Sequence, residues 1–286
     1  MGEPMARNLV RAGLPVTLYN RSPEKAQAVA ALGADVADSS DVLFARCDTV
    51  ILMLADDDAV DAVLGRGSSA FARRVTGRLI INMGTHRPAW SQALEADVRA
   101  AGGSFVEAPV SGSRLPAESG TLVAMLAGDE EAVERARPLL SPMCGEVLAL
   151  GMVPSAMAMK MAVNLYLMAT VAALAEAANL AATLGLDLDL FRSVITNGQL
   201  GSGVARAKLD KIVARDFLAQ ASIRDVCKNA ELVAATADDA GAAAPILAES
   251  RHRFEMVRAA GGGTLDMAAV VASFTPAGAA LVPETG

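Results

Sequence analysis

The segment that most constrains the fold of this chain runs from Pro154 to Leu184. After its first residue it contains neither glycine nor proline, and Ala, Leu, Met and Val dominate it. These residues favour helix, so we expect one helix of about eight turns. Because the segment is apolar on almost every side, we expect burial on all of its faces. A membrane span requires roughly 20 uninterrupted apolar residues, and this segment is interrupted by Lys160, Asn164, Glu176 and Asn179, which argues against a transmembrane helix.

Strand and helix patterns alternate before this segment. Near-continuous apolar runs at Thr49–Leu54 and Leu79–Met83 are typical of parallel strands covered on both faces. Further strands are predicted at Pro15–Asn20, Val36–Ala37, Ser104–Glu107, Thr121–Ala127 and Glu146–Leu150, with helical patterns between them. This alternation predicts an α/β fold with a doubly wound parallel sheet.

The strand pattern ends at Gly151, and Ala-rich helical patterns continue to about Ser273. We therefore expect an α/β domain over residues 1–151 and an all-α C-terminal domain over residues 152–274, joined by the long helix. Residues 275–286 contain two prolines and many small residues, which predicts a loose tail.

Composition excludes several classes of function. A length of 286 residues allows two domains with ample cores, and a net charge of -7 argues against nucleic-acid binding. Cys47, Cys144 and Cys227 show neither metal-ligand spacing nor a disulfide framework, so we expect reduced thiols in a cytoplasmic protein. His86 and His252 stand alone in the sequence and suggest neither a zinc site nor a Ser-His-Asp triad.

The first residues carry a weak nucleotide-binding pattern. Gly2 leads directly into a predicted helix, and Asn20 ends the strand that follows it. In a dinucleotide fold, a glycine-rich turn opens such a helix, and the residue that ends the next strand meets the adenine ribose. Only one glycine of that turn is present here, and a single glycine before a helix is usually a simple cap.

Four stretches together resemble the β-hydroxyacid dehydrogenase family. They are MGEPMARNL at Met1–Leu9, EAPVSGSRLPAESG at Glu107–Gly120, KMAVN at Lys160–Asn164, and Lys228-Asn229. The chain is most similar to the glyoxylate/succinic semialdehyde reductase branch, with 3-hydroxyisobutyrate dehydrogenases as more distant relatives. The resemblance implies a Rossmann-type domain related to that of 6-phosphogluconate dehydrogenase. It also implies that the first strand and two glycines of the family fingerprint are missing before Met1.

The resemblance places several residues against a nicotinamide cofactor. Gly2, Leu54, Thr85 and Lys228 fall at cofactor-contacting positions of the family, and Gly84 stands where the family has a serine. The strand that ends at Asn20 continues with Arg21 and Ser22, without a carboxylate to repel a 2′-phosphate. Since a guanidinium can pair with that phosphate, we expect NADP rather than NAD.

The resemblance also assigns the chemistry. Lys160 matches the catalytic lysine, which would protonate the oxygen of an aldehyde as hydride is transferred. Asn164, one helical turn later, would orient the lysine or the substrate oxygen. Ser111, Gly112 and Ser113 would bind the substrate carboxylate through a hydroxyl and backbone N–H groups. Without the family resemblance, Lys160 would be expected to extend to the surface, and the Ser-Gly-Ser sequence would be expected to form an ordinary turn.

Three functions are therefore considered. We expect an NADP-dependent reductase of small carboxylated aldehydes such as glyoxylate or succinic semialdehyde. One alternative is a 3-hydroxyisobutyrate- or serine-type dehydrogenase, and another is a catalytically idle scaffold with a dinucleotide fold. Departures from the family pattern, such as Pro154-Ser155-Ala156 before the catalytic helix, affect which substrate fits. The apolar helices predict a homodimer or homotetramer and no membrane partner.

Overall fold

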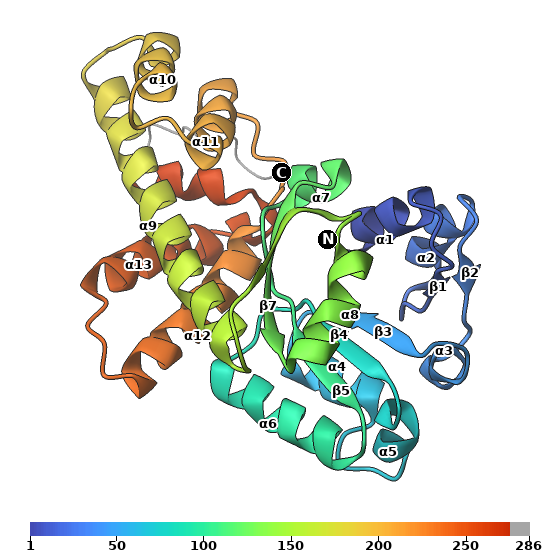
Figure 1. Cartoon of the computed structure of the whole chain (residues 1–286). Helices are drawn as coiled ribbons and strands as arrows, with labels where there is room; N and C mark the ends of the chain where they lie inside the picture. Colours follow the sequence, from blue (N-terminus) through green and yellow to red (C-terminus); the bar gives the residue numbers. More distant parts are fainter. Residues whose placement is uncertain (275–286) are drawn as a thin grey trace. The chain divides into compact units, whose positions relative to one another are not determined.

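The computed structural model describes residues 1–274 of the chain, and the predicted tail lies outside them. The chain divides into two compact units, Met1–Lys160 and Met161–Gly286. Helix α9 (Ser155–Thr183) begins in the first unit and continues into the second (Figure 1). The two units are described separately below.

The first unit alternates strands with helices, as predicted. Its strands are β1 (Thr17–Leu18), β2 (Asp35–Val36), β3 (Thr49–Leu52), β4 (Leu79–Asn82), β5 (Ser104–Glu107), β6 (Val110–Ser111), β7 (Leu122–Gly128) and β8 (Cys144–Ala149). Its helices before α9 are α1 (Gly2–Arg11), α2 (Pro23–Ala30), α3 (Ser40–Arg46), α4 (Asp57–Leu64), α5 (Ala70–Val75), α6 (Pro88–Ala100), α7 (Arg114–Ser119) and α8 (Glu130–Leu140).

The larger sheet has the order β3-β4-β5-β7-β6, with β8 paired to β7. Strands β3, β4 and β5 are parallel, and their carboxyl ends are aligned because Leu52 pairs with Asn82 and Asn82 with Glu107. All four residues of β4 are buried, as the apolar run predicted. Leu79 and Ile81 face one hydrophobic core with α8, whereas Ile80 faces a second core with α4 and α6.

The direction of β7 differs from the prediction of a wholly parallel sheet. Strand β7 is antiparallel to β5 and β6 and parallel to β8. The chain between β5 and β7 contains only β6 and the six-residue helix α7. Such a helix is about 9 Å long, whereas the seven residues of β7 extend over about 23 Å. This connection is too short to return the chain to the amino end of β5, so β7 begins beyond the carboxyl end of β5 and runs back toward it, where Ala127 pairs with Glu107.

The sheet is interrupted between β1 and β3. Strands β1 and β2 form a separate two-stranded parallel sheet, which packs with α1 and α2 around the small core of Ala6, Val29 and Ala34. In a doubly wound sheet, one strand lies between the strands that correspond to β1 and β3. Within residues 1–274 no strand fills that place.

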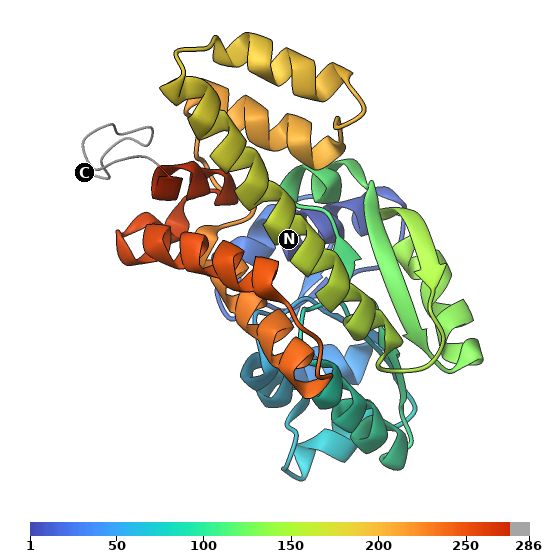
Figure 2. The same cartoon turned by 90° about the vertical axis from the view of Figure 1, so that its left-hand side faces the viewer.

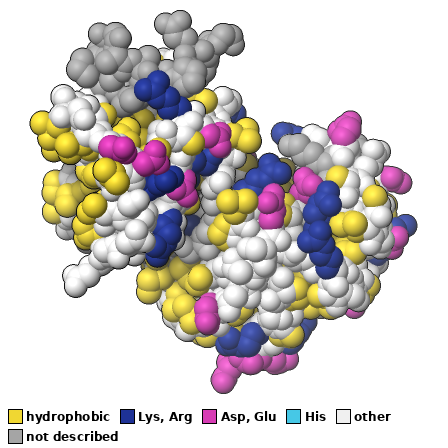
Figure 3. Space-filling model, turned by 90° about the horizontal axis from the view of Figure 1, so that it is seen from above, with side chains coloured by type: hydrophobic (Ala, Val, Ile, Leu, Met, Phe, Trp, Pro, Cys, Tyr) yellow, Lys and Arg dark blue, Asp and Glu magenta, His cyan; other side chains and the backbone are white. Residues whose placement is uncertain are grey.

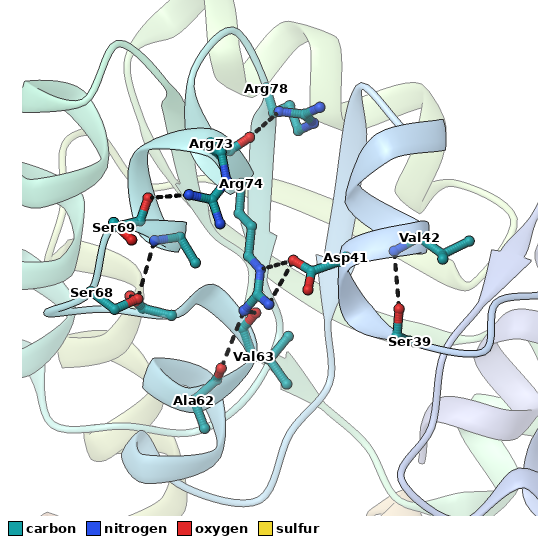
Figure 4. A network of polar contacts seen from close by, with 12 residues as sticks. Ser39, Asp41, Val42, Ala62, Val63, Ser68, Ser69, Arg73, Arg74 and Arg78 are labelled. Carbon is teal, nitrogen blue, oxygen red and sulfur yellow. Dashed lines mark hydrogen bonds and ion pairs between the residues drawn. The ribbon is translucent and has the colours of Figure 1, made fainter.

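One arginine joins three helices of the first unit (Figure 4). Arg74, on α5, donates through Nη2 to Asp41 Oδ1 of α3 at 2.8 Å and through Nη1 to the carbonyl oxygen of Val63 in α4 at 2.8 Å. Its guanidinium also lies over the ring of Phe44, 5.8 Å from the centroid. The Arg74 side chain is 13% exposed, and its bond to Val63 is partly buried, whereas Asp41 is 69% exposed.

The described part of the second unit is helical, as predicted (Figure 2). After α9 it contains α10 (Leu188–Asn197), α11 (Gly203–Ala214), α12 (Ile223–Asp239), α13 (Pro245–Ala259) and the 3-10 helices η1 (Gly262–Thr264) and η2 (Met267–Phe274). The predicted helix Pro154–Leu184 is confirmed to within one residue at each end.

Helix α9 is not buried on all faces, contrary to the prediction. Met168, Val171 and Ala175 lie in the core of the second unit, whereas Tyr166 is 71% exposed and Leu180 59% exposed. By length and composition alone, α9 could cross a membrane, a property that it shares with core helices of soluble proteins. Figure 3 shows further hydrophobic side chains at the surface of the helical unit.

Two lysines on α11, Lys208 and Lys211, do not carry ordinary surface charge. Both are buried, with 4% and 6% of their surfaces exposed. Lys208 Nζ donates to Asp266 Oδ1 at 2.8 Å, and Asp266 also accepts the backbone N–H groups of Gln220 and Ala221. The charge is tolerated because the carboxylate that neutralises it is itself fully buried and hydrogen-bonded.

Candidate active site

Lys160 lies in the second turn of α9 and does not reach the surface. Its side chain is buried, with 8% of the residue exposed, and Nζ donates a hydrogen bond to the carbonyl oxygen of Val110 at 2.8 Å. Burial lowers the pKa of the Lys160 ammonium to about 8. The amine is therefore fixed and can exchange a proton near neutral pH.

The chain after Val110 forms the predicted substrate turn. Ser111 ends β6, Gly112 has φ +130°, and Ser113 precedes α7. The backbone angle at Gly112 favours glycine, and a Cβ atom there would also lie 2.6 Å from Leu122 Cδ2. The two serines are partly exposed and can meet a ligand. The hydrogen bond to Val110 places the Lys160 amine beside this turn.

Glu107 is a further residue of this region, which no sequence pattern marked as functional. It ends β5 and is fully buried, and its Oε2 accepts the N–H groups of Ala156 and Met157 in the first turn of α9, each at 3.1 Å. Burial raises the pKa of the Glu107 carboxyl to about 7, although these amides act in the opposite direction. The carboxyl thus anchors the start of the helix that carries Lys160.

Asn164 and Lys228, two other predicted site residues, belong to the second unit. Asn164 follows Lys160 by one turn of α9 and is 3% exposed, and its Nδ2 has no hydrogen-bond partner among residues 1–274. An unpartnered buried amide is costly, so it is suited to bind a polar ligand. Lys228 lies on α12, and its role stays a prediction.

Three of the predicted cofactor residues gather at the carboxyl edge of β3 and β4. Leu54 follows β3, and Thr85 follows β4 with its side chain partly exposed. Gly2 begins α1 beside them, since a Cβ atom there would be 3.7 Å from Met53 Cβ. Ligands of doubly wound folds bind outside this edge of the sheet.

Three more predicted cofactor residues form the turn between β1 and α2. Asn20, Arg21 and Ser22 are all at least partly exposed, and Asn20 Nδ2 donates to the carbonyl oxygen of Ser22 at 2.8 Å. The Arg21 side chain is exposed and can meet an anion from solvent.

His86 stands alone in the sequence, but in the structure it has close partners. It is fully buried, its Nδ1 lies 2.5 Å from Asp57 Oδ1, and its ring stacks on Trp90 with 4.4 Å between centroids. No described residue offers a hydrogen bond to His86 Nε2. This unpartnered atom and the partly exposed Thr85 leave polar groups at the edge of β4 that suit a dinucleotide. Over the same residues, His, Cys, Asp and Glu side chains form no group that could hold a metal ion.

Family models match nearly the whole chain. Residues 1–151 match the NAD binding domain of 6-phosphogluconate dehydrogenase, and residues 155–274 match the NAD-binding domain of NADP-dependent 3-hydroxyisobutyrate dehydrogenase. The chain belongs to the β-hydroxyacid dehydrogenase family. The resemblance in the four sequence stretches is therefore confirmed, as is a Rossmann-type domain followed by a helical domain.

Individual relatives of this dehydrogenase agree with the family models. It is 30% identical to glyoxylate/succinic semialdehyde reductase 2 of Arabidopsis thaliana over 95% of this chain and 76% of the relative. The crystal structure of 3-hydroxyisobutyrate dehydrogenase from Salmonella typhimurium superposes with a TM-score of 0.86 at 27% identity, covering 94% of this chain and 95% of the other. Psf3 in complex with NADP+ and 2-OPP gives a TM-score of 0.89 at 25% identity, with 96% and 97% covered.

The dehydrogenase is thus an NAD(P)-dependent oxidoreductase that acts on CH–OH groups, as the sequence predicted. A nicotinamide cofactor is part of its chemistry, and its relatives act on small hydroxy acids or aldehydes. In the first unit, the buried Lys160 amine lies beside the Ser111–Ser113 turn, and Glu107 contacts the start of the same helix. The roles of these residues toward a substrate stay predictions.

Proposed function

We propose that this dehydrogenase is an NADPH-dependent reductase of small carboxylated aldehydes, with glyoxylate and succinic semialdehyde as the leading substrates. One observation carries the proposal: the buried Lys160 amine, with a pKa of about 8, is held beside the Ser111–Ser113 turn through the Val110 carbonyl oxygen. An ammonium that is protonated at neutral pH and ready to lose its proton suits an acid catalyst for aldehyde reduction.

Each group of the site has its own role in this proposal. The bound nicotinamide supplies the hydride. Lys160 Nζ donates its proton to the carbonyl oxygen as negative charge builds on it, and the Asn164 amide binds the same oxygen. The hydroxyl groups of Ser111 and Ser113 and the N–H groups of the turn bind the substrate carboxylate without adding a full charge to the site.

The preference for NADPH rests on the turn after β1. Arg21 presents an exposed guanidinium there, and neither Asn20 nor Ser22 is acidic. A carboxylate at this position would repel the 2′-phosphate of NADP, and a guanidinium attracts it. Psf3, which binds NADP+, has the same fold.

A 3-hydroxyisobutyrate-type dehydrogenase is the second candidate. Support for it comes from the similarity to the Salmonella typhimurium 3-hydroxyisobutyrate dehydrogenase over 94% of this chain. The same lysine would then accept a proton from the hydroxyl group instead of donating one. The direction of the reaction separates the two candidates.

We also propose that the enzyme is a cytoplasmic homodimer or homotetramer without membrane or nucleic-acid partners. Helix α10 has no buried residue within the described chain, and it exposes Leu190 and Val194, which are 66% and 73% exposed. Apolar side chains at this density favour contact with a second subunit.

The test is an NADPH-oxidation assay with glyoxylate and with succinic semialdehyde. Replacing Lys160→Ala should lower kcat/KM by a factor of about 10² to 10⁴, the usual contribution of acid catalysis. NADPH binding, measured by fluorescence titration, should be retained. Met159→Gln is the matched control, because Met159 is exposed on the same turn of α9, and it should keep wild-type turnover.

Other results of this assay would contradict the proposal or favour one of the alternatives. Wild-type turnover in the Lys160→Ala variant would show that Lys160 is not the acid. A wild type that ignores both aldehydes but oxidises 3-hydroxyisobutyrate would favour the second candidate. Absence of nucleotide binding and of turnover would indicate the idle scaffold.

A further inference from the structure

The loop after β4 contains His86, whose unpartnered Nε2 atom has a defined position. A Cβ atom built on Gly84 would lie 2.4 Å from His86 Nε2 and 3.1 Å from the carbonyl oxygen of Leu54. The imidazole thus occupies the space that a side chain at residue 84 would take. This space lies where the carboxyl ends of β3 and β4 meet.

The rest of the imidazole is fixed by its surroundings. Asp57, the first residue of α4, holds Nδ1 at 2.5 Å, and Trp90, in the first turn of α6, stacks on the ring. With Nδ1–H donated to the carboxylate, Nε2 is the only nitrogen left to bind a ligand. The residue is 0% exposed, and no described residue satisfies Nε2. Such an atom is expensive to leave unpaired.

We propose that His86 Nε2 forms a hydrogen bond with a ribose hydroxyl group of the bound dinucleotide. A hydroxyl group can donate or accept, so it satisfies Nε2 in either protonation state of the ring. The neighbouring residues Leu54 and Thr85 were already assigned to the cofactor, and the imidazole replaces the hydroxyl group that Gly84 lacks. The role concerns cofactor binding alone and does not depend on the substrate or on Lys160.

Direct titration with NADPH, followed by its fluorescence, tests this contact without turnover. The His86→Val variant should raise the Kd about tenfold, the loss expected for one hydrogen bond of about 1.4 kcal/mol. His86→Asn should have a similar effect, because the Asn amide can still donate to Asp57 but has no counterpart of Nε2. His252→Val is the control, since His252 is exposed on α13, and it should bind as the wild type does.

A serine at residue 84 gives a second, independent comparison. Gly84→Ser alone should weaken NADPH binding, because its Cβ would collide with the imidazole at 2.4 Å. The double variant Gly84→Ser/His86→Val removes that collision and supplies a hydroxyl group, so it should recover most of the affinity. Recovery in the double variant would show that the two side chains perform the same task.

Two results would overturn the proposal. One is an unchanged Kd in His86→Asn, which decides the matter even if His86→Val does not fold. The other is a wild type that binds neither NADPH nor NADH in the same titration.

Discussion

Lys160 is the residue whose protonation state sets the pH dependence of the proposed reaction. Burial lowers its pKa from 10.5 to about 8, so the ammonium is the main form at neutral pH. Reduction consumes this proton. We therefore expect kcat/KM for NADPH-linked reduction to be level below about pH 8 and to fall about tenfold per pH unit above it. Initial rates between pH 6 and 10 measure this, and a profile that rises above pH 8 would contradict it.

Glu107 makes the stability of the first unit depend on pH. Its folded-state pKa of about 7 is above the ordinary value of 4.5, so the folded state binds the proton more tightly. Its contribution to stability is complete below pH 4.5 and is lost as the pH rises through 7. Glu107→Gln keeps an oxygen for the two amides and does not titrate. The variant should match the wild type near pH 5 and exceed its free energy of unfolding at pH 8, by up to about 3 kcal/mol.

Urea unfolding followed by the fluorescence of Trp90 measures this difference. Trp90 is the single tryptophan of the chain and lies in the first unit, so the signal reports on the domain that contains Glu107. A difference between variant and wild type that stays constant from pH 5 to pH 8 would show that Glu107 does not titrate in this range.

Some of these residues can be identified from the sequence and others cannot, for a physical reason. Lys160 and the Ser111–Ser113 turn belong to contiguous motifs, so spacing and resemblance were enough to identify them. Glu107 and His86 act through Ala156 and Asp57, which are distant in sequence. These contacts arise only when the fold brings the partners together, so neither the isolated His86 nor the position of Glu107 at the start of a family stretch reveals them.

At the scale of elements, Arg74 should matter more to stability than its charge suggests. Arg74→Leu removes the hydrogen bonds to Asp41 of α3 and to the C-terminal turn of α4. Bonds of this kind to charged groups contribute about 1 to 3 kcal/mol, so we expect a loss of that size. Trp90 fluorescence in urea measures it.

The neighbouring Arg73 provides the matched control for this prediction. Its Nη1 donates to the carbonyl oxygen of Ser69, one turn earlier in the same segment, and its side chain is exposed. Arg73→Leu should change the free energy of unfolding by less than about 0.5 kcal/mol. Equal losses in the two variants would mean that Arg74 does not join the helices.

Strands and helices were largely predictable because hydrophobic periodicity is local. The run at Leu79–Met83 identified β4, and the glycine-free segment identified α9. The antiparallel direction of β7 was not predictable from periodicity, because it depends on the length of α7 and not on the residues of β7. The partial exposure of α9 could not be predicted, because an apolar pattern does not show which faces of a helix neighbouring elements cover.

For the whole molecule, the exposed apolar residues of α10 predict that assembly depends on this helix. Replacing Leu190→Glu and Val194→Glu together adds charge to a face that carries two strongly exposed apolar side chains. We expect the variant to be monomeric when the mass is measured by light scattering after size-exclusion chromatography. His252→Glu adds charge to an exposed site on α13 and should leave the mass unchanged. An assembly of wild-type mass in the double variant would place the contact elsewhere.

The interruption between β1 and β3 also has a consequence for motion. Each strand of the small β1-β2 sheet has only two residues, and an isolated pair of strands is marginal in water. The backbone amides of this pair should therefore exchange with deuterated solvent long before those of β4, whose neighbours flank it on both sides. Because Asn20, Arg21 and Ser22 follow β1 directly, we expect the turn predicted to bind the adenosine half of the cofactor to open readily. Nucleotide binding should slow the exchange of its amides.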